Sequence, residues 1–328
     1  MPSQRSTGVG LGIAVMSAMT FATSGTFARS LIDAGWSPEA AVAARVAIGA
    51  LVLAVPAALA LRGNRSALRR GAPTIAAYGL FAICAAQVSF FNAVRYLPVG
   101  VALLLEYLGI VLVVGWMWAV HRQRPRRLTV AGAVAAAIGL AFVLDVTSAG
   151  RPDPVGVLWG LGAAVGLAAY FVLSARADAG LPPTVLAGAG MAISAIALFG
   201  LGLLGAFPLD MTFHQVVLAG HRVSWLVPVL GLSVLAAGFA YVAGIAAARI
   251  LGARLSSFIG LTEVLFAVLI AWLALGELPS SHQFVGGLLI LVGVTLVRLD
   301  ERRRPETRPA VLVDADGVAG DPVPALRS

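Results

Sequence analysis

The 328-residue sequence has little charge, a single cysteine and no lysine. Charged residues make up 12% of the chain, which is too few to cover the surface of a soluble protein of this size. The lone Cys84 lies inside an apolar run, so an internal disulfide and a thiolate metal cluster are both excluded. The missing lysine excludes nothing, because arginine supplies all the positive charge apart from histidine.

Motifs of soluble enzymes and of ATP-driven pumps are also missing. The sequence contains no HExxH, no GxSxG and no P-loop GxxxxGK[ST]. No carboxylate-rich loop lies outside the apolar runs. We therefore predict a protein that is not an enzyme, that uses no cofactor and no metal, and that is not driven by nucleotide hydrolysis.

Long apolar runs dominate what is present, and 59% of the residues are apolar. A run of about 20 apolar residues crosses the hydrocarbon core of a bilayer as a helix. A barrel strand would instead alternate apolar and polar residues. We predict an all-α polytopic membrane protein with ten transmembrane helices. They are expected at residues 10–32, 39–61, 73–94, 98–120, 127–145, 154–175, 183–206, 225–248, 254–275 and 282–299. The first run is long for a signal peptide, so we expect it to be retained.

The arginines between these helices indicate the orientation. With the N-terminus inside, the inner connections contain Arg62, Arg65, Arg69, Arg70, Arg122, Arg124, Arg126, Arg127, Arg176, Arg249, Arg254, Arg298, Arg302, Arg303, Arg304 and Arg308. The outer connections contain only Arg29, Arg95, Arg151 and Arg222, beside Asp33, Glu39, Asp145, Asp153 and Asp210. Because positive charge stays inside, we predict a multi-pass protein of the plasma (inner) membrane with both termini cytoplasmic. The net charge of +8 then reflects the lipid bilayer as partner, not nucleic acid.

Identical residues recur at a constant spacing and predict an internal repeat. Pairs 154 residues apart include Arg95 and Arg249, Trp118 and Trp272, Pro125 and Pro279, Gly132 and Gly286, and Gly139 and Gly293. Earlier in the chain the spacing is 145, which aligns Pro38 with Pro183. Each half has five helices, an odd number, so the second half must insert upside down, as in many secondary transporters. We predict two inverted five-helix repeats, at residues 10–145 and 154–299.

The remaining segments carry little predicted structure. We expect a cytoplasmic N-terminal tail at 1–9 and a disordered cytoplasmic tail at 300–328. The connection at 207–224 contains His214 and His221 without a third metal ligand nearby. We therefore expect a short interfacial helix there in preference to a metal site.

Two glutamates inside apolar runs are the leading site candidates. A charge at the centre of a bilayer costs about 2.5–3.5 kcal/mol on insertion scales, so such residues usually face the bundle interior. Glu106 lies in the fourth predicted helix and Glu263 in the ninth. With the 154 spacing, Glu263 corresponds to position 109, and residues three apart share a helix face. The two carboxylates are expected to converge, either to bind a substrate ammonium or a coupling proton, or only to support packing.

Arg45, in the second predicted helix, is the third charged candidate. It could meet a substrate carboxylate or a membrane glutamate, or it could brace the packing or extend to the interface. Weaker polar and aromatic candidates in the other helices are Thr23, Gln87, Asn92, Tyr107, Tyr170 and Tyr241. For these, ordinary hydrogen bonds between helices are the alternative to substrate contact.

Two segments resemble a known family. The run from Leu255-Ser256-Ser257-Phe258 through Glu263-Val264-Leu265-Phe266-Ala267 to Leu275-Gly276-Glu277 resembles the EamA repeat of the drug/metabolite transporter superfamily. The run from Arg95-Tyr96-Leu97-Pro98 to Leu105-Glu106-Tyr107-Leu108-Gly109 is similar to the threonine/homoserine exporter branch. Family members often have proline where this chain has Ile110 and Val264.

The resemblance implies a secondary transporter that exports amino acids or other small polar metabolites through a central cavity between the repeats. By position, it assigns Glu106, Glu263 and Arg45 to motif positions of the family. Coupling to protons is a hypothesis, and facilitated diffusion of other small drugs or metabolites is an alternative. The rivals from other classes are a structural or sensory membrane protein and a membrane enzyme. Substrate identity and oligomeric state, a homodimer included, stay open.

Overall fold

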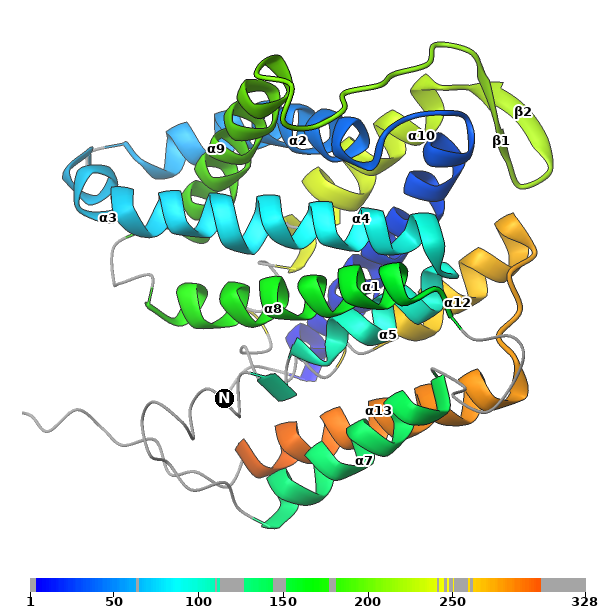
Figure 1. Ribbon diagram of the computed structural model, residues 1–328. Helices are drawn as coiled ribbons and strands as arrows, with labels where there is room; N and C mark the ends of the chain where they lie inside the picture. Colours follow the sequence, from blue (N-terminus) through cyan, green and yellow to red (C-terminus); the bar gives the residue numbers. More distant parts are fainter. Residues whose placement is uncertain are drawn as a thin grey trace, which may run out of the picture.

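The computed structural model describes residues 4–62, 65–109, 111–112, 127–143, 152–176, 181–240, 242–244, 247, 250, 259 and 262–301. Most of these residues are helical (Figure 1). Each of the ten segments predicted to cross the membrane is helical over most of the part that the structure describes.

The first half contains α1 (Gln4–Asp33), α2 (Pro38–Ala60), α3 (Arg65–Ala77), η1 (Tyr78–Ala85), α4 (Ala86–Tyr96), α5 (Val99–Tyr107) and α7 (Arg127–Val143). The second contains α8 (Pro154–Arg176), α9 (Pro183–Leu203), α10 (Leu226–Leu230), η2 (Gly231–Phe239), α12 (Thr262–Leu275) and α13 (Ser281–Glu301). The strands β1 (Gln215–Leu218) and β2 (His221–Ser224) lie between α9 and α10. Helix α1 already begins at Gln4, within the segment predicted as a tail.

The lengths and the composition of the helices fit a membrane protein. Five described segments are long and apolar enough to cross a bilayer: Gly8–Asp33, Pro38–Ala60, Leu68–Tyr96, Thr184–Leu203 and Leu226–Gly244. Four shorter apolar helices lie at Arg127–Leu140, Pro154–Tyr170, Thr262–Leu275 and Ser281–Leu296. Many large apolar side chains point outward, such as Leu51 at 73% exposure, because lipid is their solvent.

Two of the long helices contain a π-helical stretch. In the first half η1 separates α3 from α4, and in the second half η2 follows α10 without a break. A π-helical turn widens the helix and shifts its hydrogen-bonding pattern, and such turns are frequent at functional sites. The stretches start at Tyr78 and Gly231, so they occupy nearly the same place under the 154-residue spacing.

The helices pack mainly with partners from the other half of the chain. Helix α1 packs on α12 and η2, while α8 packs on α5, α4 and η1. Helices α2 and α9 pack together, and so do α7 and α13, which lie side by side along one edge in Figure 1.

We call the end of the bundle that carries β1 and β2 the hairpin end, and the opposite end, where α3 and α7 begin, the arginine end. Helix α1 begins and α13 finishes at the arginine end (Figure 1).

The connection at 207–224 is not the short helix that we expected. Residues Gln215–Leu218 and His221–Ser224 form an antiparallel hairpin, in which Val216 pairs with Val223. The turn uses Ala219 and Gly220, both with positive φ (51° and 75°), as a two-residue hairpin requires. The prediction of an interfacial helix was therefore wrong, and this hairpin is an exception to the predicted all-α fold.

Candidate functional site

Arg45 lies at the centre of a polar cluster inside the bundle. Its side chain comes from α2 and the residue is 4% exposed. Nη1 donates to Ser24 Oγ on α1 at 2.6 Å and to Gln87 Oε1 on α4 at 2.7 Å. Nη2 donates to the Ala236 carbonyl oxygen in η2 at 3.3 Å. One guanidinium thereby joins four helical segments through neutral acceptors.

The Ala236 carbonyl that Arg45 contacts lies in the π-helical stretch η2. In a regular α-helix each internal carbonyl accepts a hydrogen bond from its own helix, whereas a π-helical turn frees carbonyls for other donors. The Arg45 guanidinium also lies 5.8 Å from the centre of the Phe91 ring, a cation–π distance. Together these contacts explain how a buried cation is tolerated at this depth.

Glu106, Glu263 and Arg45 interact electrostatically with one another. Glu106 and Tyr107 lie at the end of α5, and Glu263 lies at the start of the described part of α12. Tyr107 donates its hydroxyl proton to Glu263 Oε2 at 3.1 Å. With both carboxylates ionised, the three charged groups carry one net negative charge. We call Arg45, Glu106, Tyr107 and Glu263 the central cluster.

Two other predicted site residues, Asn92 and Thr23, have different surroundings. Asn92 donates through Nδ2 to Glu39 Oε1 at 2.9 Å, and both residues are only 6% exposed. Thr23 donates to the Thr20 carbonyl of its own helix at 2.6 Å. The ring of Tyr170 lies 5.7 Å from that of Tyr78, and Tyr170 also interacts electrostatically with Glu263 of the central cluster. Tyr241 lies outside the described residues. The structure therefore brings Gln87, and not Asn92 or Thr23, to Arg45.

Glu39 is a buried residue that the sequence placed in an outer connection. It lies in the first turn of α2, two residues after Ser37, whose Oγ accepts a hydrogen bond from Ala40 N at 3.2 Å. An acidic residue in a first helical turn is ordinary, because it complements the helix dipole. Its pairing with Asn92 links α2 to α4, so Asn92 has a structural partner in this conformation.

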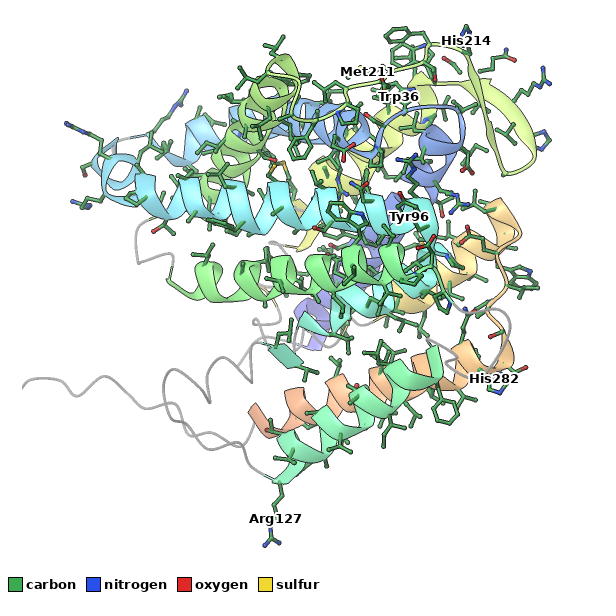
Figure 2. All side chains as sticks on the ribbon, in the orientation of Figure 1. Trp36, Tyr96, Arg127, Met211, His214 and His282 are labelled. Carbon is green, nitrogen blue, oxygen red and sulfur yellow. The ribbon has the colours of Figure 1, made fainter. Side chains whose placement is uncertain are left out.

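Histidines do not form a metal site in the described part of the chain. Figure 2 shows His214 beside the hairpin and His282 at the start of α13, in different parts of the molecule. Within the described residues, no three side chains of His, Cys, Asp or Glu are placed to hold one metal ion.

The sequence matches a known family over most of its length. The model of the EamA-like transporter family matches residues 8–145 and again residues 154–299. An uncharacterized transporter of Bacillus subtilis (strain 168), YwfM, is 26% identical over 234 residues, covering 70% of this chain and 76% of that protein. An uncharacterized inner membrane transporter of Salmonella typhimurium (strain LT2), YicL, is 24% identical over 241 residues, covering 72% and 76%.

A solved structure also has a similar fold. A protein crystal structure at 22% identity has a TM-score of 0.58 and covers 90% of this chain and 98% of its own. The likeness supports the fold alone. The family match and the apolar helices together identify a multi-pass membrane protein.

Proposed function

Because the chain belongs to the EamA-like transporter family, we propose that it is a secondary transporter that exports amino acids or similarly small polar metabolites. The observation that carries this proposal is the central cluster. Its charged groups come from α2, α5 and α12, and thus from both halves of the chain. A charged cluster inside a bundle of apolar helices is costly, and such clusters mark substrate and ion pathways.

The chemistry of the cluster favours a substrate that carries both charges. An arginine side chain suits a carboxylate, because its planar fork donates two parallel hydrogen bonds. In this conformation Arg45 donates to three neutral acceptors, Ser24, Gln87 and Ala236, which a substrate carboxylate could replace. Glu106 and Glu263 would then face the ammonium group of the same molecule. This arrangement supports amino acids as the substrate class.

Charge balance supports coupling to protons. Two carboxylates and one guanidinium leave one negative charge, which is unfavourable in a poorly solvated site. A bound proton would neutralise it. A zwitterionic amino acid brings no net charge, but its ammonium group would compete with the proton for the same carboxylates. If the two compete, export of one substrate exchanges for entry of one proton. Efflux that is insensitive to collapse of the pH gradient would contradict this coupling.

Two inverted repeats, at residues 10–145 and 154–299, form the framework of this proposal. The helix contacts support it, since α1 packs on α12 as α8 packs on α5, and α1 packs on η2 as α8 packs on η1. Reciprocal glycine contacts between α7 and α13 also support it. A Cβ on Gly139 would lie 2.6 Å from the Gly286 oxygen, and one on Gly293 would overlap the Gly132 oxygen. The two contacts are equivalent under the 154-residue spacing, because Gly139 corresponds to Gly293 and Gly132 corresponds to Gly286.

The arginine end is proposed to face the cytoplasm. Arg62, Arg69, Arg70 and Arg127 are exposed there, as the positive-inside rule requires of a cytoplasmic surface. Both chain termini would then be cytoplasmic, and the hairpin would lie outside.

A resistance assay tests the transport role of Glu106. Cells that overproduce the wild type are challenged with growth-inhibiting amounts of single amino acids and small metabolites, next to cells producing Glu106→Gln. Asp153→Asn, at the exposed start of α8, is the matched control. We expect protection by the wild type and the control but not by Glu106→Gln at equal membrane levels. Equal protection by all three would reject the role of Glu106, and protection against no compound would contradict export.

A further inference from the structure

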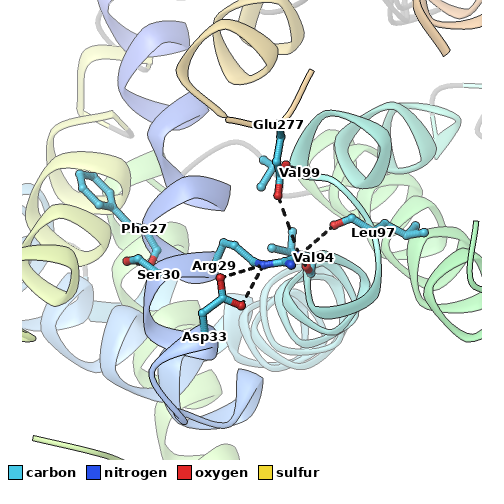
Figure 3. Close-up of polar contacts among 8 residues, drawn as sticks. All are labelled: Phe27, Arg29, Ser30, Asp33, Val94, Leu97, Val99 and Glu277. Carbon is cyan, nitrogen blue, oxygen red and sulfur yellow. Dashed lines mark hydrogen bonds and ion pairs between the residues drawn. The ribbon is translucent and has the colours of Figure 1, made fainter. Parts of the chain in front are cut away.

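A second polar network closes the hairpin end of the bundle around Arg29 (Figure 3). Arg29 lies near the end of α1, and its Nε donates to Asp33 Oδ1 at 3.0 Å and Oδ2 at 3.2 Å. Nη1 donates to the Val94 carbonyl oxygen at 2.7 Å, near the end of α4, and lies 3.9 Å from Glu277 Oε1. Arg29 therefore fastens α1 to the end of α4 and to the segment after α12.

Glu277 extends the network to α5. Helix α12 ends at Leu275, and Gly276 adopts a positive φ of 72°, which turns the chain back toward α5. The carboxylate Oε2 then accepts a hydrogen bond from the Val99 N–H at 2.9 Å. Val99 is the first residue of α5, and its N-cap residue Pro98 offers no side-chain acceptor. Glu277 thus satisfies a free amide at the start of a neighbouring helix.

The network lies at one end of α5 and the central cluster at the other. Val99 is seven residues from Glu106, which corresponds to roughly 10 Å along a helix. Between them the packing is dense, since Ala102 has no exposed surface and a Cβ on Gly100 would lie 2.7 Å from Val268 on α12. No described residue of this stretch is open to water: Val99 and Val101 are 1% and 4% exposed.

On its other side the network borders an open pocket at the hairpin end. The pocket has a volume of about 700 Å³ and is lined by Asp33 of α1, Gln215 of β1 and Trp272 near the end of α12. Asp33 belongs to both the pocket and the network. The hairpin is tied to the same place, because Ala219 N donates to the Ala274 carbonyl oxygen at 3.1 Å.

We propose that this network is the gate at the hairpin end of the transport route, and that Arg29 and Glu277 are the residues that hold it shut. The inference rests on the proposed transport function. In the described conformation the route between the central cluster and the pocket is therefore closed. The contacts suit a reversible closure, because carboxylates, a guanidinium and helix-end amides and carbonyls can exchange their partners for water when the helix ends separate.

Accessibility of a single cysteine tests the gate without requiring transport. The reporter is Ala102→Cys in a Cys84→Ala background. Ala102 lies one turn from Glu106 on the same face of α5. Cells are treated with a membrane-impermeant thiol reagent, and the labelling rate is measured. Arg29→Ala and Glu277→Ala should each label about tenfold faster, the effect expected when a charge-assisted hydrogen bond is lost.

Arg95→Ala is the matched control. Arg95 lies in the last turn of α4 at the same end, is exposed, and stacks on Tyr96 at 5.6 Å. Its removal should leave the labelling rate unchanged. Unchanged labelling in both network variants, or an equal rise in the control, would overturn the gate. If labelling follows our expectation but no compound is exported, the closing contact stands and the proposed transport function fails.

A cross-link decides the matter if the alanine variants do not reach the membrane. Ala34→Cys and Ala274→Cys, in the same background, leave Arg29 and Glu277 in place and both line the pocket beside the network. The two cysteines are joined with a flexible, reducible bifunctional reagent. We expect the link to block export and a reducing agent to restore it. Full export with the link in place would overturn the gate.

Discussion

Arg45 shows how a single side chain can hold several membrane helices at one point. A guanidinium has five N–H donors in a fixed plane, so it can serve Ser24, Gln87 and Ala236 at the same time. A lysine carries the same charge on a single nitrogen and cannot reproduce this geometry. The residue therefore has a structural role in the described conformation, whatever it binds during transport.

We predict that Arg45→Lys lowers the free energy of unfolding by about 1–3 kcal/mol, because at least one buried acceptor loses its donor. Thermal stability in detergent, followed by size-exclusion chromatography, measures the effect. Arg62→Lys, at the exposed arginine end, is the control and should match the wild type. Stability of Arg45→Lys equal to that control would show that the contacts with Ser24, Gln87 and Ala236 contribute little.

Glu277 gives the gate a dependence on pH. Burial raises the pKa of its carboxyl above the ordinary value of 4.5, against the lowering effects of the Val99 N–H and Arg29, and Asp33 raises it further. When the gate opens to water, the pKa should return toward 4.5. The closed state therefore binds a proton more readily than the open state, so acidification favours closure and alkalinity favours opening.

We predict that labelling of the Ala102→Cys reporter slows as the external pH falls through the raised pKa of Glu277 toward 4.5. Glu277→Gln keeps an acceptor for Val99 N–H but cannot ionise. Its labelling should therefore be slow at every pH and independent of pH, after correction for reagent reactivity. Faster labelling of the wild type in acid would contradict the assigned sign.

The sequence singled out some residues of the proposed sites and missed others for a physical reason. Arg45, Glu106 and Glu263 were recognisable because a charge within an apolar run is anomalous. Arg29, Glu39 and Glu277 lie at helix ends, where a charge is expected and carries no signal. The Ala236 carbonyl could not be predicted either, since nothing in Gly231–Phe239 marks a π-helical turn.

At the scale of elements, glycine determines how closely α7 and α13 approach. Gly139 and Gly293 each face the backbone of the partner helix, with no room for a side chain. Small residues are the usual means of packing helices in lipid, where no hydrophobic force drives helices together. The packing of α7 on α13 therefore depends on how closely the surfaces of the two helices fit together.

We predict that Gly139→Ala destabilises the protein by about 1–3 kcal/mol, because the new Cβ overpacks against Gly286 and Ile290. Gly200→Ala on α9 is the control: a Cβ there meets nothing within 4 Å, and alanine favours helix formation. The melting temperature of purified Gly139→Ala should therefore lie below that of the wild type. The melting temperature of Gly200→Ala should be no lower than that of the wild type. Equal values would contradict tight packing.

The hairpin shows where pattern analysis of elements fails. The prediction of an interfacial helix at 207–224 followed from a polar connection between two apolar runs. The structure instead pairs strands of four residues, Gln215–Leu218 and His221–Ser224, around Ala219 and Gly220. Strands this short give almost no periodic signal, and Ala-Gly is a weaker hairpin turn than Asn-Gly or Asp-Gly.

At the scale of the whole molecule, helix positions were predictable and helix partners were not. A span needs about 20 apolar residues, so each run could be located from composition. The contacts of α1 with α12, and of α8 with α5, join residues far apart in the chain, and apolar runs of similar composition do not indicate which of them meet. The 154-residue spacing predicted which positions of the two halves are equivalent. It did not predict which helices are in contact.

Membrane orientation is the prediction on which the direction of transport depends. If the arginine end is cytoplasmic, a cysteine at Ser66 should react with an impermeant thiol reagent only in inside-out vesicles, because it is exposed beside Arg69 and Arg70. A cysteine at His221, exposed in β2, should react only in right-side-out vesicles. Both variants carry Cys84→Ala.

Reaction of both positions from one side would contradict the inverted repeats, since the helices would not alternate as proposed. Reaction with the sides exchanged would keep the repeats but place the Arg29 gate on the cytoplasmic face, so that opening it would admit substrate from the cell instead of releasing it outside.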